Sequence, residues 1–378
     1  MILFISKYRF PEGDAGSERE LYLAQAYQRL GYEVLFWAHG DRKEGIHKGI
    51  PYISLRINNH RVLSHLLWFP RLLAKFLSYS NKLTIEAVIV GSIDTFSFGF
   101  LKKWCKRNGV TFIVDSVEWY DARQFKCGTR SLMYQSNNKL VTRRIDQQCN
   151  VISISSYLHT FYTDKGIKSV NIPVIFNQDE VPYIEKKATE ELVLLYAGSP
   201  GRKDFLDVML QGLSLLSDEL LSRIHFNIIG VSEEQIINNL CDEASYVRLK
   251  PVLSVYGRKP MSFVREIMRE TDFNVLLRDG SYRNAQAGFS TKVVEGVTYS
   301  TPFIMNFTSD LEFYFNDGVD CLRVDDFTAP AFCDSVKKAL SMTATEKAEM
   351  SKKTKLTAIR CFNLDSYEER LKDILNRL

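Results

Sequence analysis

The sequence predicts an α/β protein built from two helix-covered parallel sheets, in a chain whose 378 residues are enough for two domains. Short apolar runs alternate with helical patterns, and this alternation occurs in two successive series. The hydrophobic content of 45% is that of a globular protein. No run approaches the roughly 18 uninterrupted apolar residues of a membrane span.

The first series begins with a predicted strand at Ile2–Ser6. This run has no basic leader and no small-residue cleavage site, so we expect a strand and not a signal peptide. Ser17 is predicted to cap a helix running to Leu30, with Glu20 completing a capping box. The remaining strands of this series are Glu33–Ala38, Ala87–Val90, Thr111–Val114 and Asn150–Ile154.

The second series repeats the pattern after residue 190. Its predicted strands are Leu192–Tyr196, His225–Ile229, Tyr246–Leu249, Phe273–Leu277, Pro302–Asn306 and Cys321–Val324. Between the two series, a short apolar run ending at Phe176 gives way to polar and charged residues, which is the composition of a linker. We therefore expect domains at 1–177 and 191–364 with a linker at 178–190. The last segment, 365–378, has apolar residues at helical spacing.

Charge is unevenly distributed along the chain. Up to Asn177 there are 24 Lys and Arg against 14 Asp and Glu, a balance of +10, and the remainder has 25 against 31, a balance of −6. A basic half suits phosphate, anionic lipid or nucleic acid. We expect no nucleic-acid partner, because the basic residues are dispersed and no recognised binding motif accompanies them. The seven cysteines include no CxxC pair, and their odd number is typical of reduced thiols in a cytoplasmic protein.

The stretch 288–295 is the most informative for function. A glycine-containing turn opens a predicted helix, and Glu295 lies one turn into it. Free backbone N–H groups and the positive helix end can hold a phosphate there, helped by Ser290, Thr291 and the adjacent Lys292. Glu295 can accept hydrogen bonds from sugar hydroxyls. This is the chemistry of nucleotide-sugar binding, although Ser290 and Thr291 also suit simple helix capping.

Further cations follow other predicted strands of the second series. Gly198 lies in a turn after the first of these strands, and Arg202 and Lys203 come next. Open α/β sheets bind ligands at the carboxyl ends of their strands, where this pair would meet a pyrophosphate. Arg278 and Arg283 stand between a later strand and the 288–295 turn, so either could supply another cation. The alternatives are a solvated loop for the pair and a local ion pair for Arg278.

These motifs resemble the retaining nucleotide-sugar glycosyltransferases of the two-domain GT-B fold, glycosyltransferase family 4. In that family the stretch equivalent to 287–295 has a Glu at both ends, and a small-residue turn and Pro follow before a strand. A basic pair neutralises the donor diphosphate. Glu295, Pro302 and the Arg202-Lys203 pair match this pattern, whereas the first Glu position is Ala287.

The resemblance implies two Rossmann-like domains whose parallel sheets face each other across a cleft, with a hinge at Asn177 and a terminal helix, 365–378, that returns to the first domain. It also implies transfer of a sugar from a nucleotide-diphosphate sugar to an acceptor hydroxyl with retention of anomeric configuration, the departing phosphate taking the acceptor's proton. The implied acceptor is a glycan or lipid-linked glycan of surface polysaccharide synthesis.

The resemblance further implies that no metal or cofactor is needed. Arg202 and Lys203 would stabilise the leaving diphosphate in place of a metal. The six histidines and the late Asp325-Asp326 pair give no convincing metal-ligand spacing. Two other functions stay open, a non-catalytic binding subunit, which Ala287 motivates, and a nucleotide-sugar epimerase.

Two loops of the first domain are candidates for the acceptor side. Gly16, in the loop 11–17, would let the backbone approach a ligand, or would form a plain turn. Asp115 and Glu118 follow a strand and stand beside aromatic residues, which suits sugar recognition, and we take them as candidate catalytic carboxylates. The family often has a His in this region, and this chain has none between residues 65 and 159. The alternative for both carboxylates is a helix N-terminus.

The segment Arg61–Leu77 combines basic residues, aromatics and leucines at helical spacing. This combination is typical of an interfacial helix, and a helix packed on the first sheet has the same pattern. Together with the basic balance of this half, it leads us to expect contact with an anionic membrane surface at its inner face.

Overall fold

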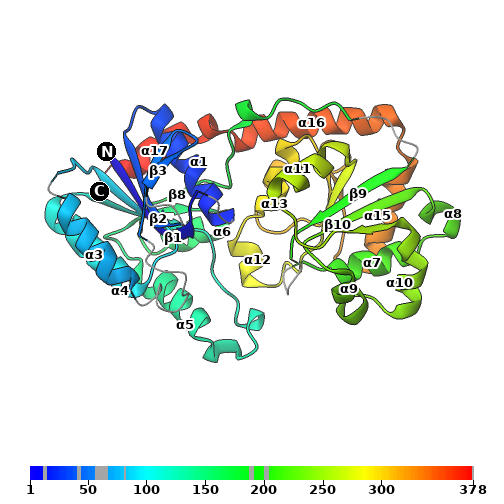
Figure 1. The fold of residues 1–378 in the computed structure, drawn as a ribbon, viewed down its shortest axis with the longest axis horizontal. Helices are drawn as coiled ribbons and strands as arrows, with labels where there is room; N and C mark the ends of the chain where they lie inside the picture. The colour runs from blue at the N-terminus through cyan, green and yellow to red at the C-terminus, as the bar shows by residue number, and fades with distance from the viewer. Residues whose placement is uncertain are drawn as a thin grey trace. The chain divides into compact units, whose positions relative to one another are not determined.

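The computed structural model describes residues 1–11, 15–40, 44–55, 67–80, 82–186, 191–199 and 204–376 (Figure 1). The chain divides into two compact units. Unit 1 contains Met1–Phe176, Ala287–Phe289 and Leu364–Leu378, and unit 2 contains Asn177–Gln286 and Ser290–Asn363. Each unit is a parallel sheet with helices packed on it, which confirms the predicted α/β class of two Rossmann-like domains.

Unit 1 is built on an eight-stranded sheet, as far as the described residues show, with strand order β3-β4-β2-β1-β5-β6-β7-β8. All neighbours pair parallel except β3 and β4. The strands are β1 (Ile2–Arg9), β2 (Val34–His39), β3 (Glu44–His47), β4 (Ile50–Ser54), β5 (Ala87–Val90), β6 (Thr111–Ser116), β7 (Asn150–Ser153) and β8 (Ser169–Asn171). The helices are α1 (Ala15–Arg29), α3 (Trp68–Tyr79), α4 (Thr95–Asn108), α5 (Leu132–Lys139), α6 (Ser156–Thr163) and α17 (Glu368–Leu375).

Unit 2 is built on a six-stranded parallel sheet, again within the described ranges, in the order β11-β10-β9-β12-β13-β14. The strands are β9 (Leu192–Ala197), β10 (Ile224–Ile229), β11 (Leu253–Val255), β12 (Phe273–Leu276), β13 (Phe303–Met305) and β14 (Leu322–Arg323). The helices are α7 (Leu206–Ser214), α8 (Asp218–Leu221), α9 (Glu233–Asn239), α10 (Glu243–Leu249), α11 (Met261–Glu270), α12 (Arg283–Ala287), α13 (Thr291–Thr298), α14 (Leu311–Tyr314), α15 (Ala329–Ser341) and α16 (Ala344–Phe362).

Central strands of both sheets are buried along their length. Every residue of β5, β6 and β12 is buried, because helices cover both faces of a parallel sheet. The apolar runs that predicted these strands therefore correspond to the core of each unit. The other predicted strands are also confirmed apart from shifts at their ends, with one exception.

The exception is Tyr246–Leu249, which is helical and belongs to α10. Asp242 caps this helix by accepting a hydrogen bond from the Ser245 N–H at 2.9 Å. The strand of this part of the sheet comes later, as β11. The capping residue Asp242 thus favours a helix at a position where the short apolar run alone predicted a strand.

The predicted start of the first helix was also wrong. Helix α1 begins at Ala15, so Ser17 and Glu20 lie inside it and are buried instead of forming a capping box. Residues 12–14 lie outside the described ranges.

The end of the described chain completes unit 1. Helix α17 packs against β6, β7 and β8, and the carbonyls of its last turn meet the amino ends of β6 and β7. The Asn150 amide donates to the Ile374 carbonyl at 2.6 Å, and the Thr111 hydroxyl donates to the Leu375 carbonyl at 3.0 Å. Arg29 of α1 pairs with Asp365 at 2.8 Å.

Two lysines hold the segment that opens unit 2. Lys355 of α16 donates to Gln178 Oε1 at 3.0 Å and to the carbonyls of Val181 at 2.6 Å and Thr298 at 3.0 Å. Lys186 donates to the Met268 carbonyl at 2.7 Å. The predicted linker therefore packs on unit 2 over its described part, and residues 187–190 lie outside the described ranges.

Helix α3 covers the described part of the segment predicted to meet a membrane. Its Trp68, Leu72 and Phe76 are buried in unit 1, whereas Arg71 and Leu77 are exposed. The apolar stripe is therefore used for packing, and residues 61–66 are outside the described ranges. Among the described helices, none is both long and apolar enough to cross a membrane.

Candidate nucleotide-sugar site in unit 2

A pocket of about 320 Å³ lies at the carboxyl ends of the central strands of unit 2. Residues at the ends of β9 and β10, the loop before α11, and α13 contribute to its lining. This is the edge at which open α/β sheets bind ligands. Three predicted site residues, Gly198, Lys292 and Glu295, line it together.

Gly198 directly follows β9 and has a backbone conformation that favours glycine. Its φ of +148° is unusual for a residue with a side chain, and a Cβ there would lie 2.1 Å from Lys292 Nζ. The ammonium group of Lys292 therefore sits directly over the backbone of the turn. A side chain at position 198 would require the end of Lys292 to move.

A buried carboxylate fixes this lysine. Asp204 accepts from Lys292 Nζ and pairs with Arg278 Nε at 2.9 Å, and Tyr196 donates its hydroxyl to the same carboxylate at 3.1 Å. Burial alone would raise the pKa of Asp204, but Arg278 and Lys292 hold that pKa below its ordinary value. Asp204 is thus an anion that gathers two cations.

The ion pair of Arg278 is with Asp204, 74 residues earlier in the chain, and is therefore not the local pair considered from the sequence. Its backbone is also fixed, because Asn306 accepts from the Arg278 N–H at 2.8 Å and donates to the Arg278 carbonyl at 2.7 Å. Arg278 is not among the residues that line the pocket.

The helix predicted to follow the glycine-containing turn is α13, which begins at Thr291 with Ser290 as its N-terminal flanking residue. The Ser290 side chain makes no capping hydrogen bond. Its Oγ is buried and has no hydrogen-bond partner among the described residues. The buried Ser290 hydroxyl and the positive end of α13 are therefore available to an anion.

Glu295 lies one turn into α13 and is 7% exposed. Arg265 of α11 approaches it, with 3.6 Å between Arg265 Nε and Glu295 Oε1. The same guanidinium lies 5.9 Å from the centre of the Tyr299 ring. The sequence reasoning missed Arg265, because only the three-dimensional packing of α11 beside α13 brings the two residues together.

The remaining walls of the pocket are largely apolar. Leu195, Val264, Met268 and Phe303 contribute to them. Among them lies Asn274, whose Nδ2 is buried without a hydrogen-bond acceptor among the described residues. A flat group with hydrogen-bond acceptors, such as a nucleobase, would fit such a wall and satisfy this donor.

Two exposed cations at the rim were also missed. Arg258 and Lys259 follow β11 and line the pocket. Had the strand been placed at β11 instead of at 246–249, the rule of carboxyl-end binding would have drawn attention to them.

The structure does not place the other predicted cations in the pocket lining. Arg202 and Lys203 lie outside the described residues, between Ser199 and Asp204 of the site. Arg283 starts α12 and is half-buried, away from the pocket lining. Within the described residues, no group of three or more His, Cys, Asp or Glu could hold a metal ion.

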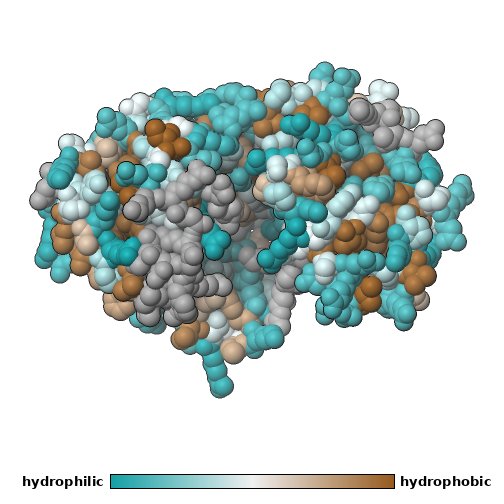
Figure 2. Space-filling model, in the orientation of Figure 1, coloured by the Kyte–Doolittle hydropathy of each residue, from teal (hydrophilic) through white to brown (hydrophobic). Residues whose placement is uncertain are grey.

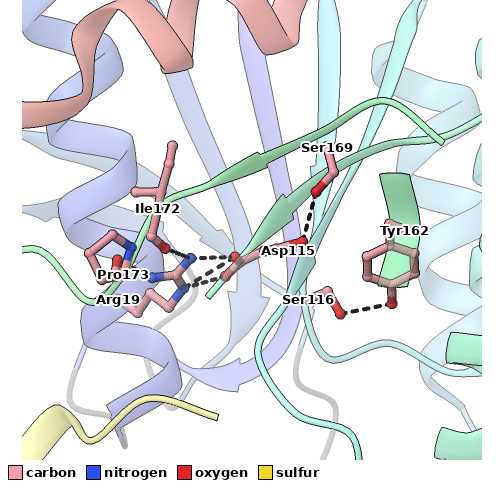
Figure 3. A network of polar contacts seen from close by, with 8 residues as sticks. Arg19, Asp115, Ser116, Tyr162, Ser169, Ile172 and Pro173 are labelled. Atoms are coloured by element: carbon pink, nitrogen blue, oxygen red, sulfur yellow. Dashed lines mark hydrogen bonds and ion pairs between the residues drawn. The ribbon is translucent and has the colours of Figure 1, made fainter. Parts of the chain in front are cut away.

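Asp115 of unit 1 is engaged by a buried arginine (Figure 3). Arg19 Nη2 lies 2.9 Å from Asp115 Oδ1 and Arg19 Nε lies 3.0 Å from Oδ2, and the side chains are 2% and 1% exposed. Arg19 also donates to the carbonyls of Ile172 at 3.0 Å and Pro173 at 2.6 Å. The Asp115 carboxylate thus joins β6 to Arg19 of α1, and the same guanidinium joins α1 to the chain after β8, which gives both residues a structural role.

Glu118 differs from Asp115 in position. It is half-buried and lines a pocket of about 490 Å³ in unit 1, at the carboxyl ends of β1, β5 and β6. Asn137 of α5 fixes the backbone of this loop by donating to the Glu118 carbonyl at 3.2 Å and accepting from the Tyr120 N–H at 2.9 Å. Burial, followed by the neighbouring Glu118, raises the pKa of Tyr120.

Gly16 lies in the first turn of α1, and its position is set by an aromatic ring. A Cβ there would lie 2.3 Å from Cζ of Tyr8. The glycine lets Tyr8 pack against the helix, and Tyr8 itself lines the unit 1 pocket.

Ala287, which occupies the position of the first Glu of the family pattern, is buried. Ala287 is 0% exposed and its carbonyl accepts from the Ser155 hydroxyl at 2.8 Å.

The fold is that of GT-B glycosyltransferases, α/β with two Rossmann-like domains, and solved structures with this fold are similar over the whole chain. Sucrose-phosphate synthase from Thermosynechococcus elongatus has a TM-score of 0.72 and 12% identity, covering 99% of this chain and 98% of that one. HepE from Anabaena, solved with UDP and glucose, has a TM-score of 0.70 and 12% identity, covering 100% and 99%. WaaG, a glycosyltransferase of lipopolysaccharide biosynthesis, has a TM-score of 0.67 and 12% identity, covering 99% of each chain. No protein-family model and no curated protein matches the sequence significantly.

Proposed function

We propose that this protein is a glycosyltransferase that moves a sugar from a nucleotide-diphosphate sugar to an acceptor hydroxyl. The unit 2 pocket carries the proposal, because it combines Lys292 beside the Gly198 turn with Glu295 and an apolar wall. Lys292 suits a phosphate, Glu295 suits a ribose, and the apolar wall suits a base. The similarity in fold to HepE, which was solved with UDP-glucose, supports this interpretation.

In the proposed reaction the cations and the start of α13 stabilise the negative charge that grows on the leaving diphosphate. Lys292 is already held in place by Asp204, so little reorganisation is needed when the donor binds. Arg202 and Lys203 would add to this charge stabilisation. The proposal includes retention of anomeric configuration and independence from metal ions.

The acceptor would enter the unit 1 pocket. Glu118 and Asp94 bring carboxylates to this pocket, and Leu140 and Val141 give it an apolar side. Such a mixed lining suits a glycan or a lipid-linked glycan. We place the reaction in polysaccharide synthesis at the cytoplasmic face of a membrane.

A second candidate is a non-catalytic relative that binds a nucleotide or glycan as a partner subunit. Ala287 favours it, because this buried alanine occupies the position where the family has a glutamate. The two candidates share donor binding and differ in turnover.

The test is calorimetry with UDP, GDP and ADP, followed by nucleotide release from the matching sugar nucleotides with a glycan acceptor, in EDTA. A ligand at a hundred times its Kd should raise the free energy of unfolding by about 2.7 kcal/mol. Acceptor-dependent nucleotide release supports the transferase. Binding without release supports the partner subunit, a new free sugar without acceptor indicates an epimerase, and the absence of any nucleotide binding removes all three.

A further inference from the structure

We propose that residues 122–144 of unit 1 form a docking surface for an anionic lipid bilayer. This stretch, here called the α5 segment, contains the 3-10 turns at Ala122–Gln124 and Gly128–Arg130, helix α5 and the π-helical turn Leu140–Arg144. The inference deepens the proposed location at a membrane and rests on it. It differs from the sequence prediction, which gave this role to Arg61–Leu77.

Charge is the first observation. Between Asp121 and Asp146 the chain has no carboxylate side chain. The cations in this interval are Arg123, Lys126, Arg130, Lys139, Arg143 and Arg144. All are exposed except Arg144, which is half-buried. Arg123 pairs with Asp121 at 2.9 Å, so the excess positive charge of the segment comes from the other cations. A segment with such an excess is attracted to anionic headgroups, and added salt should screen the attraction.

Exposed apolar side chains are the second observation. Leu132 is 81% exposed and Met133 is 62% exposed, and α5 has no buried residue. Figure 2 shows brown and tan apolar residues among teal hydrophilic ones along the lower edge of unit 1, where Figure 1 places α5. Large apolar side chains surrounded by cations are suited to the boundary between headgroups and acyl chains. A nucleic acid would gain little from them, because Leu and Met offer no ring on which bases stack.

Hydrogen bonds also hold the α5 segment to the rest of unit 1. Ser131 caps α5, Asn137 holds the backbone at Glu118 and Tyr120, and Trp119 Nε1 donates to Asn138 Oδ1 at 3.0 Å. Helix α3 offers less to a bilayer, because its Trp68, Leu72 and Phe76 are buried.

The position of the surface has a consequence for the acceptor. Leu132 and Met133 contribute to the lining of the unit 1 pocket that also contains Glu118. A bilayer docked on the α5 segment would therefore lie at the mouth of this pocket. An acceptor carrying a lipid could reach it without leaving the membrane.

The experiment uses the whole protein and sedimentation with vesicles of phosphatidylcholine alone or mixed equally with phosphatidylglycerol. Binding to the anionic vesicles should fall roughly tenfold or more in Arg130→Gln/Lys139→Gln, and should also fall in Leu132→Ser/Met133→Ser. Matched controls in unit 2 are Lys337→Gln/Lys338→Gln and Leu356→Ser/Ile359→Ser, which also change exposed residues and should bind as the parent does.

A probe at Cys127 gives an independent measurement. Cys127 lies in the α5 segment and is exposed, whereas the other six cysteines are buried or half-buried. An environment-sensitive dye on it should shift to the blue with anionic vesicles and not with neutral ones. No binding, equal binding to both vesicles, or unchanged binding in both α5 variants would overturn the proposal. Nucleotide calorimetry on the same variants should match the parent, so a failure of donor binding is seen separately.

Discussion

Lys292 is bonded to the buried carboxylate of Asp204, and this pair places the lysine ammonium group over the backbone of Gly198. The Asp204 side chain is 2% exposed, so its charge depends on Lys292 and Arg278. The pair connects two parts of the chain that lie far apart in sequence. It therefore anchors the candidate phosphate site to a buried carboxylate of unit 2.

We expect Asp204→Asn to lower the free energy of unfolding by about 3 kcal/mol, because it breaks a buried ion pair and leaves two cations without their anion. Urea unfolding followed by fluorescence measures this. The control is Asp334→Asn, which removes the exposed Lys337–Asp334 pair and should cost no more than about 1 kcal/mol. Equal losses in the two variants would contradict the structural role of Asp204.

Gly198→Ala should weaken nucleotide-diphosphate binding by roughly tenfold or more, because the new methyl group displaces Lys292 Nζ. The positive φ adds a backbone strain of about 1 kcal/mol. Gly31→Ala is the matched control, since Gly31 also has a positive φ but a Cβ added there would meet no atom within 4 Å. Calorimetry and urea unfolding together separate strain from lost binding, and a binding loss in both variants would refute the displacement argument.

Glu295→Ala should reduce nucleotide affinity by about 1.5–3 kcal/mol, the contribution of a charge-assisted hydrogen bond to a ribose hydroxyl. Calorimetry with the nucleotide that binds the parent protein measures it. Glu266→Ala, on the exposed side of α11, serves as control and should leave affinity unchanged. Unaltered affinity in a folded Glu295 variant would place the ribose elsewhere.

The two first-domain carboxylates should respond differently to substitution. Asp115→Asn should destabilise the protein by about 3–5 kcal/mol, because it leaves Arg19 buried without its anion. Glu118→Gln should change stability little and should lower turnover if Glu118 contacts the acceptor. Thermal unfolding and nucleotide-release rates test both. A stable Asp115→Asn protein without turnover would restore Asp115 as a catalytic candidate.

Lys355 should make stability depend on pH. Burial lowers the pKa of Lys355 to about 8 from the ordinary 10.5, with Asp179 partly opposing the shift. Between these values the unfolded chain holds the Lys355 proton and the folded chain does not, so the contribution of Lys355 to the free energy of unfolding should rise as pH increases from about 8 to 10.5. Lys355→Met should lack this contribution. Urea midpoints of the two proteins at about pH 7.5 and 10 measure it, and parallel changes would exclude Lys355 as the source.

The repeated alternation of strands and helices was readable from the sequence because parallel sheets buried on both faces need continuous apolar runs. The failure at 246–249 shows the limit of that signal. A short apolar run fits a buried helix turn as well as a strand, and Asp242 decided for the helix. The edge strand β11 is only half-buried, so its pattern was weak.

Only the part of the candidate site that depends on local sequence was predicted. Lys292 and Glu295 follow directly from the turn that opens α13, which is a local feature. Arg265 and the role of Asp204 depend on contacts between elements distant in sequence, and no periodicity reveals such contacts. Asp115 looked like a functional carboxylate because the sequence gives no hint that Arg19 reaches it across the sheet.

Helix α17 affects the order in which the two units can be completed during synthesis. The donors of Thr111 and Asn150 find their acceptors in Leu375 and Ile374, which are translated only after all of unit 2. While the ribosome is still making unit 2, the amino ends of β6 and β7 in unit 1 lack these two acceptors. Unit 2 can therefore finish folding first, although the ribosome makes most of unit 1 before it.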